Sequence, residues 1–125
     1  MLFDSDIIIW ALRDNTKAQT AIENDPEIAI STVTYIEIIR GLKNKERLQK
    51  WKSLVSELGI DILPINETIS ARAMFWSEEF TLSHGLELAD ALIAATADTH
   101  GLTLFTGNTK DFRYLPGLNF KIFKE

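Results

Sequence analysis

Short apolar runs alternate with longer segments of helical spacing along the chain, and this pattern predicts strands and helices in turn. Strands are predicted at residues 1–4, 28–30, 60–63 and 102–105, with residues 120–123 as the candidate for a fifth. Helices are predicted at residues 5–13, 16–24, 34–40, 44–58, 67–83 and 86–100. The alternation predicts an α/β fold in a single domain, residues 1–125, with three layers around a mainly parallel sheet of four to five strands.

Local signals place several element boundaries. Pro26 disfavours helix in the residue before it and so ends the second helix. Thr34 followed by Glu37 has the spacing of a capping box and predicts that the third helix begins at Thr34. Three helical segments are followed by a glycine that predicts their end: Gly41, Gly59 and Gly101. The first helical segment contains three successive isoleucines, so its pattern is also compatible with a strand.

The composition is that of a globular protein. Apolar residues make up 46% of the chain and charged residues 25%, unlike a disordered sequence. No apolar stretch reaches the roughly 18 residues that a membrane span needs. Asp4 and Asp6 interrupt the first apolar run, and no basic segment precedes it, which is not the pattern of a secretory signal. We therefore expect a cytoplasmic protein that does not enter a membrane.

The residue types restrict the chemistry. The chain has no Cys and two isolated His, which excludes disulfides, thiolate nucleophiles and sulfur-based zinc sites. The net charge of −5 argues against a nucleic-acid coat protein, because phosphate binding favours a basic surface. A basic cluster nevertheless lies between positions 40 and 52: Arg40, Lys43, Lys45, Arg47, Lys50 and Lys52. It is either a solvated helix face or, if an acidic pocket lies beside it, a surface that contacts RNA.

Four acids interrupt or follow apolar runs, where a lone charge is rare: Asp4, Glu37, Asp90 and Asp111. Glu37 lies among isoleucines and Asp90 among leucines and alanines, so both are expected to be partly buried. Asp4 ends the first strand, and Asn108 and Asp111 follow the fourth. Because parallel sheets bind ligands beyond the carboxyl ends of their strands, several of these side chains are expected at one edge of the sheet.

Taken singly, each acid also has a purely structural interpretation. Asp90 lies near the start of its helix, where the helix dipole favours a carboxylate. Asp6 can be the N-cap of the helix that continues from residue 7. Local partners are available to Glu37 and Asp111, namely Thr34 or Arg40 for Glu37 and Asn108 for Asp111.

Taken together, the acids predict a cation. Three or four carboxylates at one edge repel each other and need a positive charge to be stable when ionised. Ligand sets made only of oxygen favour Mg²⁺ or Mn²⁺ over zinc or copper. Such an ion activates a bound water and neutralises phosphate charge, so the cluster predicts metal-assisted hydrolysis of a phosphodiester.

The order of four motifs resembles the PIN-domain ribonucleases, and specifically the toxin subunits of VapBC-type toxin–antitoxin modules. These motifs are FDSD, STVTYIEIIRGL, LELADALIAATADTHGL and LFTGNTKDF, and they extend from about residue 2 to residue 112. The third and fourth are the most specific. The resemblance implies a PIN-like sandwich and an endoribonuclease that cuts RNA through a water activated by Mg²⁺ or Mn²⁺.

The resemblance also implies roles for individual residues. Asp4, Glu37 and Asp90 match three acids of the metal site, and Asp111 or Asn108 matches the fourth. We favour Asp111 as the ligand, with Asn108 and Thr106 orienting ligands or water. Asp6 matches a position that is often Asn, and is an auxiliary ligand or a helix cap.

Two positions depart from the family pattern. Gly107 stands where a basic residue is common, and His84 where an aromatic residue is common before Gly85. The first departure concerns contacts with RNA more than the chemistry. His84 is interpreted as a residue of the surface or the edge of the core, with substrate contact as the alternative.

The family further implies two protein partners. Its toxins form homodimers and are inhibited by an antitoxin that wraps the early helices and reaches the acidic pocket. Residues 7–12, with Trp10 and Trp51, are candidates for an apolar groove that receives it, or else for core.

Two rival functions remain open. The first is a phosphatase of the haloacid dehalogenase type, because a strand ending in Asp-x-Asp resembles its motif, with Asp4 as nucleophile and Asp6 as acid/base. Ile8 replaces the Thr of that motif, and no later lysine motif stands out. A receiver-like domain fits poorly, since its acceptor Asp should end a middle strand. The second rival is a PIN-like module that binds RNA or an antitoxin without cutting.

Overall fold

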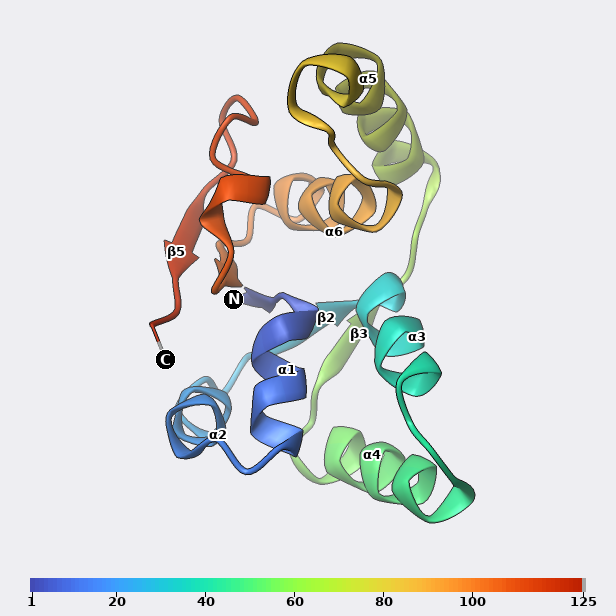
Figure 1. The fold of residues 1–125 in the computed structure, drawn as a ribbon, viewed down its shortest axis with the longest axis vertical. Helices are drawn as coiled ribbons and strands as arrows, with labels where there is room; N and C mark the ends of the chain where they lie inside the picture. Colours follow the sequence, from blue (N-terminus) through green and yellow to red (C-terminus); the bar gives the residue numbers. More distant parts are fainter. Residues whose placement is uncertain (125) are drawn as a thin grey trace.

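The computed structural model describes residues 1–124, whose strands and helices form three layers (Figure 1). The strands of this part of the chain are β1 (Leu2–Phe3), β2 (Ala29–Ser31), β3 (Asp61–Leu63), β4 (Leu104–Thr106) and β5 (Phe120–Ile122). The helices are α1 (Ser5–Leu12), α2 (Thr16–Glu23), α3 (Thr32–Arg40), α4 (Lys45–Glu57), α5 (Glu67–His84) and α6 (Leu88–Thr99), with a 3₁₀ turn η1 (Thr109–Asp111). The predicted α/β alternation is confirmed, including the fifth strand.

The strands form one sheet in the order β3-β2-β1-β4-β5, and every pair is parallel. After β1, the chain forms β2 beside it and then β3 beside β2. It then crosses to the other side of β1, where it forms β4 and β5. The strand order therefore reverses between β1 and β4. In open parallel sheets this is the point where a crevice for a ligand forms beyond the carboxyl ends of the strands.

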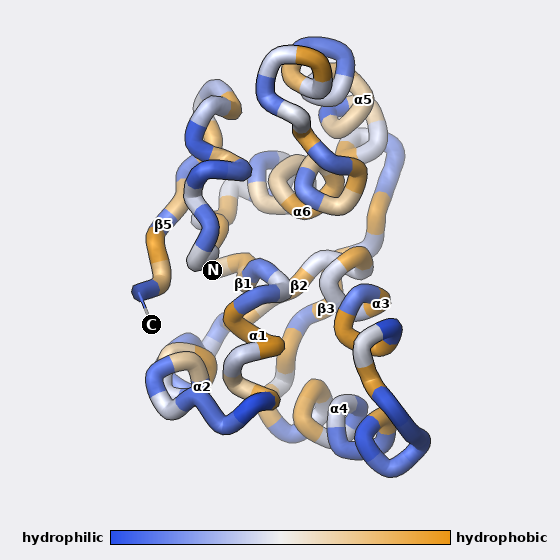
Figure 2. The backbone as a smooth tube through the Cα atoms, viewed as in Figure 1, coloured by the Kyte–Doolittle hydropathy of each residue, from blue (hydrophilic) through white to orange (hydrophobic). Residues whose placement is uncertain are grey.

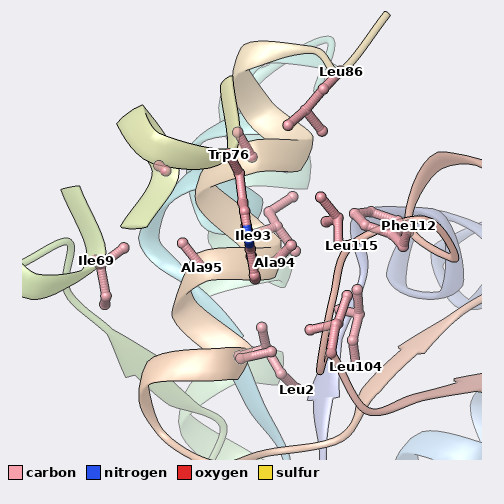
Figure 3. Packing of buried hydrophobic residues seen from close by; sticks show 14 of the residues in the cluster. Leu2, Ile69, Trp76, Leu86, Ile93, Ala94, Ala95, Leu104, Phe112 and Leu115 are labelled. Atoms are coloured by element: carbon pink, nitrogen blue, oxygen red, sulfur yellow. The ribbon is translucent and has the colours of Figure 1, made fainter. Parts of the chain in front are cut away.

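Alternate strand residues contribute to two separate cores. Leu2 and Leu104 pack on the face covered by α5 and α6, whereas Phe3 and Phe105 pack on the face covered by α1, α2 and α4. Figure 3 shows the first core, with side chains from β1 and β4 packed under α6 and Trp76 of α5 beyond it. Burial on both faces explains why the central strands are apolar runs rather than alternating patterns.

The isoleucine triplet forms a helix, which settles the alternative that its pattern left open. Ile7 and Ile8 of α1 are fully buried against the second core, together with Phe3. The backbone turns into the helix at Asp4, whose carboxylate accepts a hydrogen bond from the Ser5 N–H. Capping at the strand end thus favours helix for residues that are also good strand formers.

The predicted start of α3 at Thr34 is wrong. The helix begins at Thr32, and its N-cap is Ser31, whose hydroxyl accepts a hydrogen bond from the Val33 N–H. Two serine or threonine positions in this segment fit the capping pattern, and the earlier one is used because β2 ends there. Thr34 lies inside the helix and is fully buried.

The distribution of hydropathy matches these layers. The connection from α3 to α4 and the start of α4 are mostly hydrophilic (Figure 2). Within residues 1–124, no helix is both long enough and apolar enough to cross a bilayer.

Candidate functional site

Asp4 lies at the switch point of the sheet, between the ends of β1 and β4. Its Oδ1 accepts a hydrogen bond of 2.8 Å from the Ser5 N–H, and its Oδ2 accepts one of 2.7 Å from the Thr106 hydroxyl. The Thr106 oxygen in turn accepts a 3.0 Å bond from the Asn108 N–H. Asp4 is only 8% exposed, so these contacts fix a buried carboxylate at the carboxyl edge of the sheet. Thr106 therefore contacts Asp4 directly.

Glu37 is brought to the same edge by α3. The Ser5 hydroxyl donates a 2.6 Å hydrogen bond to Glu37 Oε1 and lies 3.3 Å from the Thr34 hydroxyl. In the described part of the chain Glu37 forms neither the capping box with Thr34 nor an ion pair with Arg40. Both structural alternatives for Glu37 are therefore wrong, and the half-buried carboxylate is held by the residue that follows Asp4.

Asp6 is not the N-cap of α1, because Asp4 occupies that position. Its Oδ2 accepts a 3.0 Å hydrogen bond from the Gly107 N–H, and its Oδ1 accepts one of 2.8 Å from the Ile7 N–H. Asp6 thereby joins the first turn of α1 to the segment after β4.

Gly107 is required by the packing of Trp10. A Cβ built at position 107 would lie 2.6 Å from the Trp10 ring and 3.0 Å from Asp6 Oδ2. Real Cβ atoms do not approach this closely, so any larger residue would displace the indole. The absence of a basic side chain at this position is thus explained by Trp10, which also packs against Phe123.

Asp90 and Asp111 approach from the opposite side of the switch point. Asp90 is half-buried in the first turn of α6, where it also benefits from the helix dipole. Asp111 lies in η1, and the Asn108 side-chain amide donates a 2.6 Å hydrogen bond to its Oδ2. Asn108 thus contacts both Asp111 and Thr106, and it positions the loop that carries the fourth acid.

The pKa values of these acids indicate that they lie close enough to repel one another. The pKa of Asp4 is raised to about 7, first by burial and then by the charge of Asp6, with Glu37 acting in the same direction. The pKa of Asp90 is raised to about 7 by burial and by the charges of other acids, those of Asp4 and Asp111 being the largest. Burial also raises the pKa of Asp6, and Asp111 adds to the effect.

Among the described residues, none of these five carboxylates forms an ion pair with Lys or Arg. A cluster of this kind is unstable when fully ionised unless a cation binds to it.

The donor set fits a hard divalent ion. All candidate ligands are carboxylate, hydroxyl or amide oxygens, which suits Mg²⁺ or Mn²⁺. Within residues 1–124, no three His, Asp or Glu side chains converge closely enough to enclose a metal unaided. An ion at this edge would therefore be held by few side chains and would keep several waters, as Mg²⁺ commonly does.

A cavity of about 300 Å³ opens beside Glu37, between α1, α3 and the start of α4. Its walls are apolar at Ile9, Leu12 and Leu42 and basic at Arg13, Lys43 and Arg47. The predicted basic cluster is therefore divided. Lys43 and Arg47 lie by the acidic site, whereas Lys50 pairs weakly with Glu46 on the exposed side of α4. We call this cavity with its lining residues the α1–α3 cavity.

The predicted apolar groove needs correction. Ile7, Ile8 and Trp51 are fully buried in the second core and are not available to a partner. Ile9 and Leu12 are only partly buried against this core, and both line the α1–α3 cavity.

Some residues of this region were missed by sequence reasoning. Ser5 lies between the two predicted acids of FDSD, and its small polar side chain at a helix start was the available signal. Arg13 gave no signal, because only the packing of α1 against α3 brings it to Lys43. Tyr114 follows Asp111 by three residues, and burial together with the charges of Asp111 and Asp90 raises its pKa.

A fully parallel sheet with acids gathered at the β1/β4 switch point defines a PIN-type α/β domain. The family model described as the PIN domain matches residues 1–118. Ribonuclease VapC10 of Mycobacterium tuberculosis is 36% identical over 116 residues, which cover 90% of this chain and 85% of that protein.

Solved structures agree with this match. One is a toxin–antitoxin complex from Klebsiella pneumoniae, with 34% identity, a TM-score of 0.74, and 94% of this chain and 93% of that chain covered. VapBC2 from Rickettsia felis, bound to a DNA fragment from its promoter, has a TM-score of 0.81. Its 23% identity, over 97% of this chain and 96% of that chain, shows a common fold.

The chain belongs to the PIN-domain family, as a VapC-type ribonuclease toxin of a toxin–antitoxin system. This membership removes the phosphatase of the haloacid dehalogenase type and the receiver-like domain as interpretations of Asp4.

The raised pKa of Asp4 predicts a pH-dependent effect of Asp4→Asn on stability in metal-free buffer. The folded chain binds this proton more tightly than the unfolded chain, so stability is lost as pH rises through the window from about 4 to about 7. Asparagine keeps a cap acceptor and cannot ionise. We expect Asp4→Asn to stabilise the protein by about 1–2 kcal/mol at about pH 8 and much less at about pH 5, measured by thermal unfolding in EDTA.

Asp98→Asn serves as the control, because Asp98 pairs with Arg72 away from the cluster. Added Mn²⁺ is expected to stabilise the wild type more than Asp4→Asn. An equal effect of Asp4→Asn at both pH values contradicts the view that Asp4 is a crowded, buried carboxylate.

Proposed function

We propose that this chain is a metal-dependent endoribonuclease whose site consists of Asp4, Glu37, Asp90 and Asp111, acting on RNA in the cytoplasm. The observation that carries this proposal is the cluster of carboxylates at the switch point, which lacks a protein cation in the described chain. A bound Mg²⁺ or Mn²⁺ would supply an activated water and neutralise charge on the scissile phosphate.

We assign a separate role to each side chain of the site. Asp4 and Asp90 are the two acids whose pKa is raised to about 7, and we assign them as the principal metal ligands. Glu37 uses Oε1 for the Ser5 hydroxyl, so its Oε2 is the oxygen that orients the attacking water. Asp111 completes the site, and Asn108 positions it. Thr106 fixes the orientation of Asp4, and Asp6 acts by holding the Gly107 segment.

Cleavage of RNA by the purified protein tests this assignment. With Mg²⁺ or Mn²⁺ the wild type is expected to cut, and EDTA is expected to abolish cutting. Asp4→Asn and Asp90→Asn should each lower kcat by about 100-fold or more, because each removes a charged ligand without changing side-chain shape. Asp98→Asn is the matched control and should cut like the wild type.

If the wild type leaves tRNA, rRNA and mRNA intact with either metal, the chain is instead a PIN-like module that binds RNA or an antitoxin without cutting. If the Asn variants cut as fast as the wild type, the assigned ligands are wrong.

We propose that the basic edge of the α1–α3 cavity guides the RNA backbone to this site. Lys43, Arg47 and Arg13 line the cavity together with Glu37, so they lie where phosphates next to the cleaved bond would pass. Arg40, Lys45, Lys50 and Lys52 are exposed and do not line this cavity, and we propose a smaller role for them.

The contribution of this edge is tested by salt dependence. Arg47→Ala is expected to weaken RNA binding several-fold and to reduce the slope of log Kd against log salt by about 1, since one phosphate contact is lost. Lys52→Ala is the control on the same helix and should change both values much less. A salt slope unchanged by Arg47→Ala would place the RNA elsewhere.

We also propose that the α1–α3 cavity is the docking site of a cognate antitoxin. Ile9, Leu12 and Leu42 offer apolar wall to one face of an amphipathic segment, and Glu37 offers a carboxylate to a basic side chain at its end. Such a segment would cover the acidic site and the phosphate path together.

A homodimer is proposed through α5. Met74 and Phe75 are large apolar side chains with 63% and 54% exposure. Phe75 and Ala71 border a shallow hollow on the same helix. A protrusion beside a hollow can be self-complementary, as a two-fold interface requires.

One pair of variants separates the two partners. Leu12→Asp is expected to weaken antitoxin binding by at least about tenfold, because it places a charge on the apolar wall of the cavity, and RNA cleavage by the free protein should persist. Phe75→Asp should leave antitoxin affinity unchanged and shift the protein to a monomer in sedimentation. Unchanged antitoxin affinity in Leu12→Asp contradicts the docking site, and an unaltered sedimentation coefficient in Phe75→Asp contradicts the dimer face.

A further inference from the structure

Three aromatic rings gather near Asp111 and Asp90, on elements that do not line the α1–α3 cavity. Phe80 and His84 come from the last turn of α5, and Tyr114 comes from the segment after η1. The His84 ring stacks on the Tyr114 ring with centroids 4.2 Å apart and an interplanar angle of 14°. Phe80 lies 5.4 Å from Tyr114 and 5.7 Å from His84, and supports both from the core side.

The chain ties this pair to the candidate metal ligands. Tyr114 follows Asp111 by three residues, so their Cα atoms lie within roughly 11 Å of each other. His84 is followed by Gly85, whose left-handed backbone (φ 66°) ends α5 and turns the chain toward the first turn of α6, which carries Asp90. The Tyr114 phenol experiences the charges of Asp111 and Asp90.

Packing alone does not account for His84. Phe80 and Tyr114 are half-buried and pack against the first core, which explains their presence. His84 is exposed, and its imidazole rests on Tyr114 at the protein surface rather than filling the core. The other described histidine, His100, is also exposed and lies at the opposite end of α6.

An exposed aromatic ring can add to RNA affinity at an acidic edge, where phosphate is repelled. Nearby carboxylates repel the phosphate backbone, and the chain carries a net charge of −5. Stacking of a base on an aromatic ring contributes affinity that does not depend on attraction of phosphate. A base within a duplex has both faces covered, so only an unpaired base can use an exposed ring.

We propose that His84, supported by Tyr114, is a stacking surface for an unpaired base of the RNA next to the cleaved phosphate. This inference rests on the proposed function, and it assigns His84 and Tyr114 as the contact for one base of the bound strand. The basic edge of the α1–α3 cavity then holds the backbone on one side of the acids, and the ring pair holds a base on the other.

The test uses 2-aminopurine, whose fluorescence is quenched by stacking. Short single-stranded oligoribonucleotides with 2-aminopurine at successive positions are titrated with the full chain carrying Asp4→Asn, which is expected to slow cleavage by about 100-fold or more. Quenching is expected at one position in the strand and not when the same oligonucleotide is paired. His84→Ala should remove this quenching and weaken binding by about tenfold. His84→Phe should retain both, and His100→Ala should match the parent.

His84 is exposed, so its variants are expected to fold, and equal thermal unfolding of His84→Ala and the parent checks this. Quenching that persists in His84→Ala, or that is lost equally in His84→Phe, overturns the stacking surface. Cleavage assays on chains with Asp4 intact separate the two proposals. Cleavage with an unchanged KM in His84→Ala overturns the stacking surface and leaves the nuclease standing. Position-specific quenching without any cleavage by the wild type supports the stacking surface and refutes the nuclease.

Discussion

Repulsion among carboxylates at the carboxyl edge of the sheet is the interaction on which the arrangement of this molecule depends. Burial raises the pKa of Asp4 and of Asp90 to about 7, and the charges of neighbouring acids add to the effect in each case. Such a cluster costs folding energy unless hydrogen bonds and a cation offset it. The hydroxyls of Ser5 and Thr106 supply part of this compensation. We propose that a hard cation bound at this edge supplies the remainder.

The two cores hold the acids against that repulsion. β1 and β4 are buried on both faces, so the residues that end them cannot move apart without exposing apolar surface from two layers. Asp4 caps α1 and Asp90 lies in the first turn of α6, and both helices pack directly on the sheet. Gly107 and Trp10 complete this arrangement, because the indole occupies the space of the missing side chain.

The surroundings of the acidic edge are asymmetric. On one side lie the basic residues of the α1–α3 cavity, and on the other lies the His84–Tyr114 pair. In the proposed complex with RNA, this negatively charged chain would present separate surfaces to the phosphate backbone and to a base. The same cavity offers apolar wall to a protein segment, so binding of a partner there and passage of RNA would exclude one another.

Sequence alone determined the elements and the acids. Apolar runs separated by helical patterns were sufficient to predict a parallel α/β sandwich. Strands that are buried on both faces are apolar at nearly every position, and this makes them recognisable in the sequence. Their charges beside or inside apolar runs marked Asp4, Glu37 and Asp90 as candidate site residues, since burial of an unpaired carboxylate costs free energy. The start of α3 was misplaced, because Ser31 and Thr34 both fit a capping pattern and only the end of β2 selects the first.

Tertiary structure decided which residues meet. The crossing from β3 to β4 on the far side of β1 placed Thr106 against Asp4, although 102 residues separate them. On the other face of the sheet, the packing of α1, α3 and α4 divided the basic cluster, buried Trp51 and brought Arg13 to the cavity that Glu37 also lines. Periodicity reports which face of an element is buried, but it does not report which other element covers that face. The partners of each acid, and the surfaces around them, therefore became visible only when the layers were assembled.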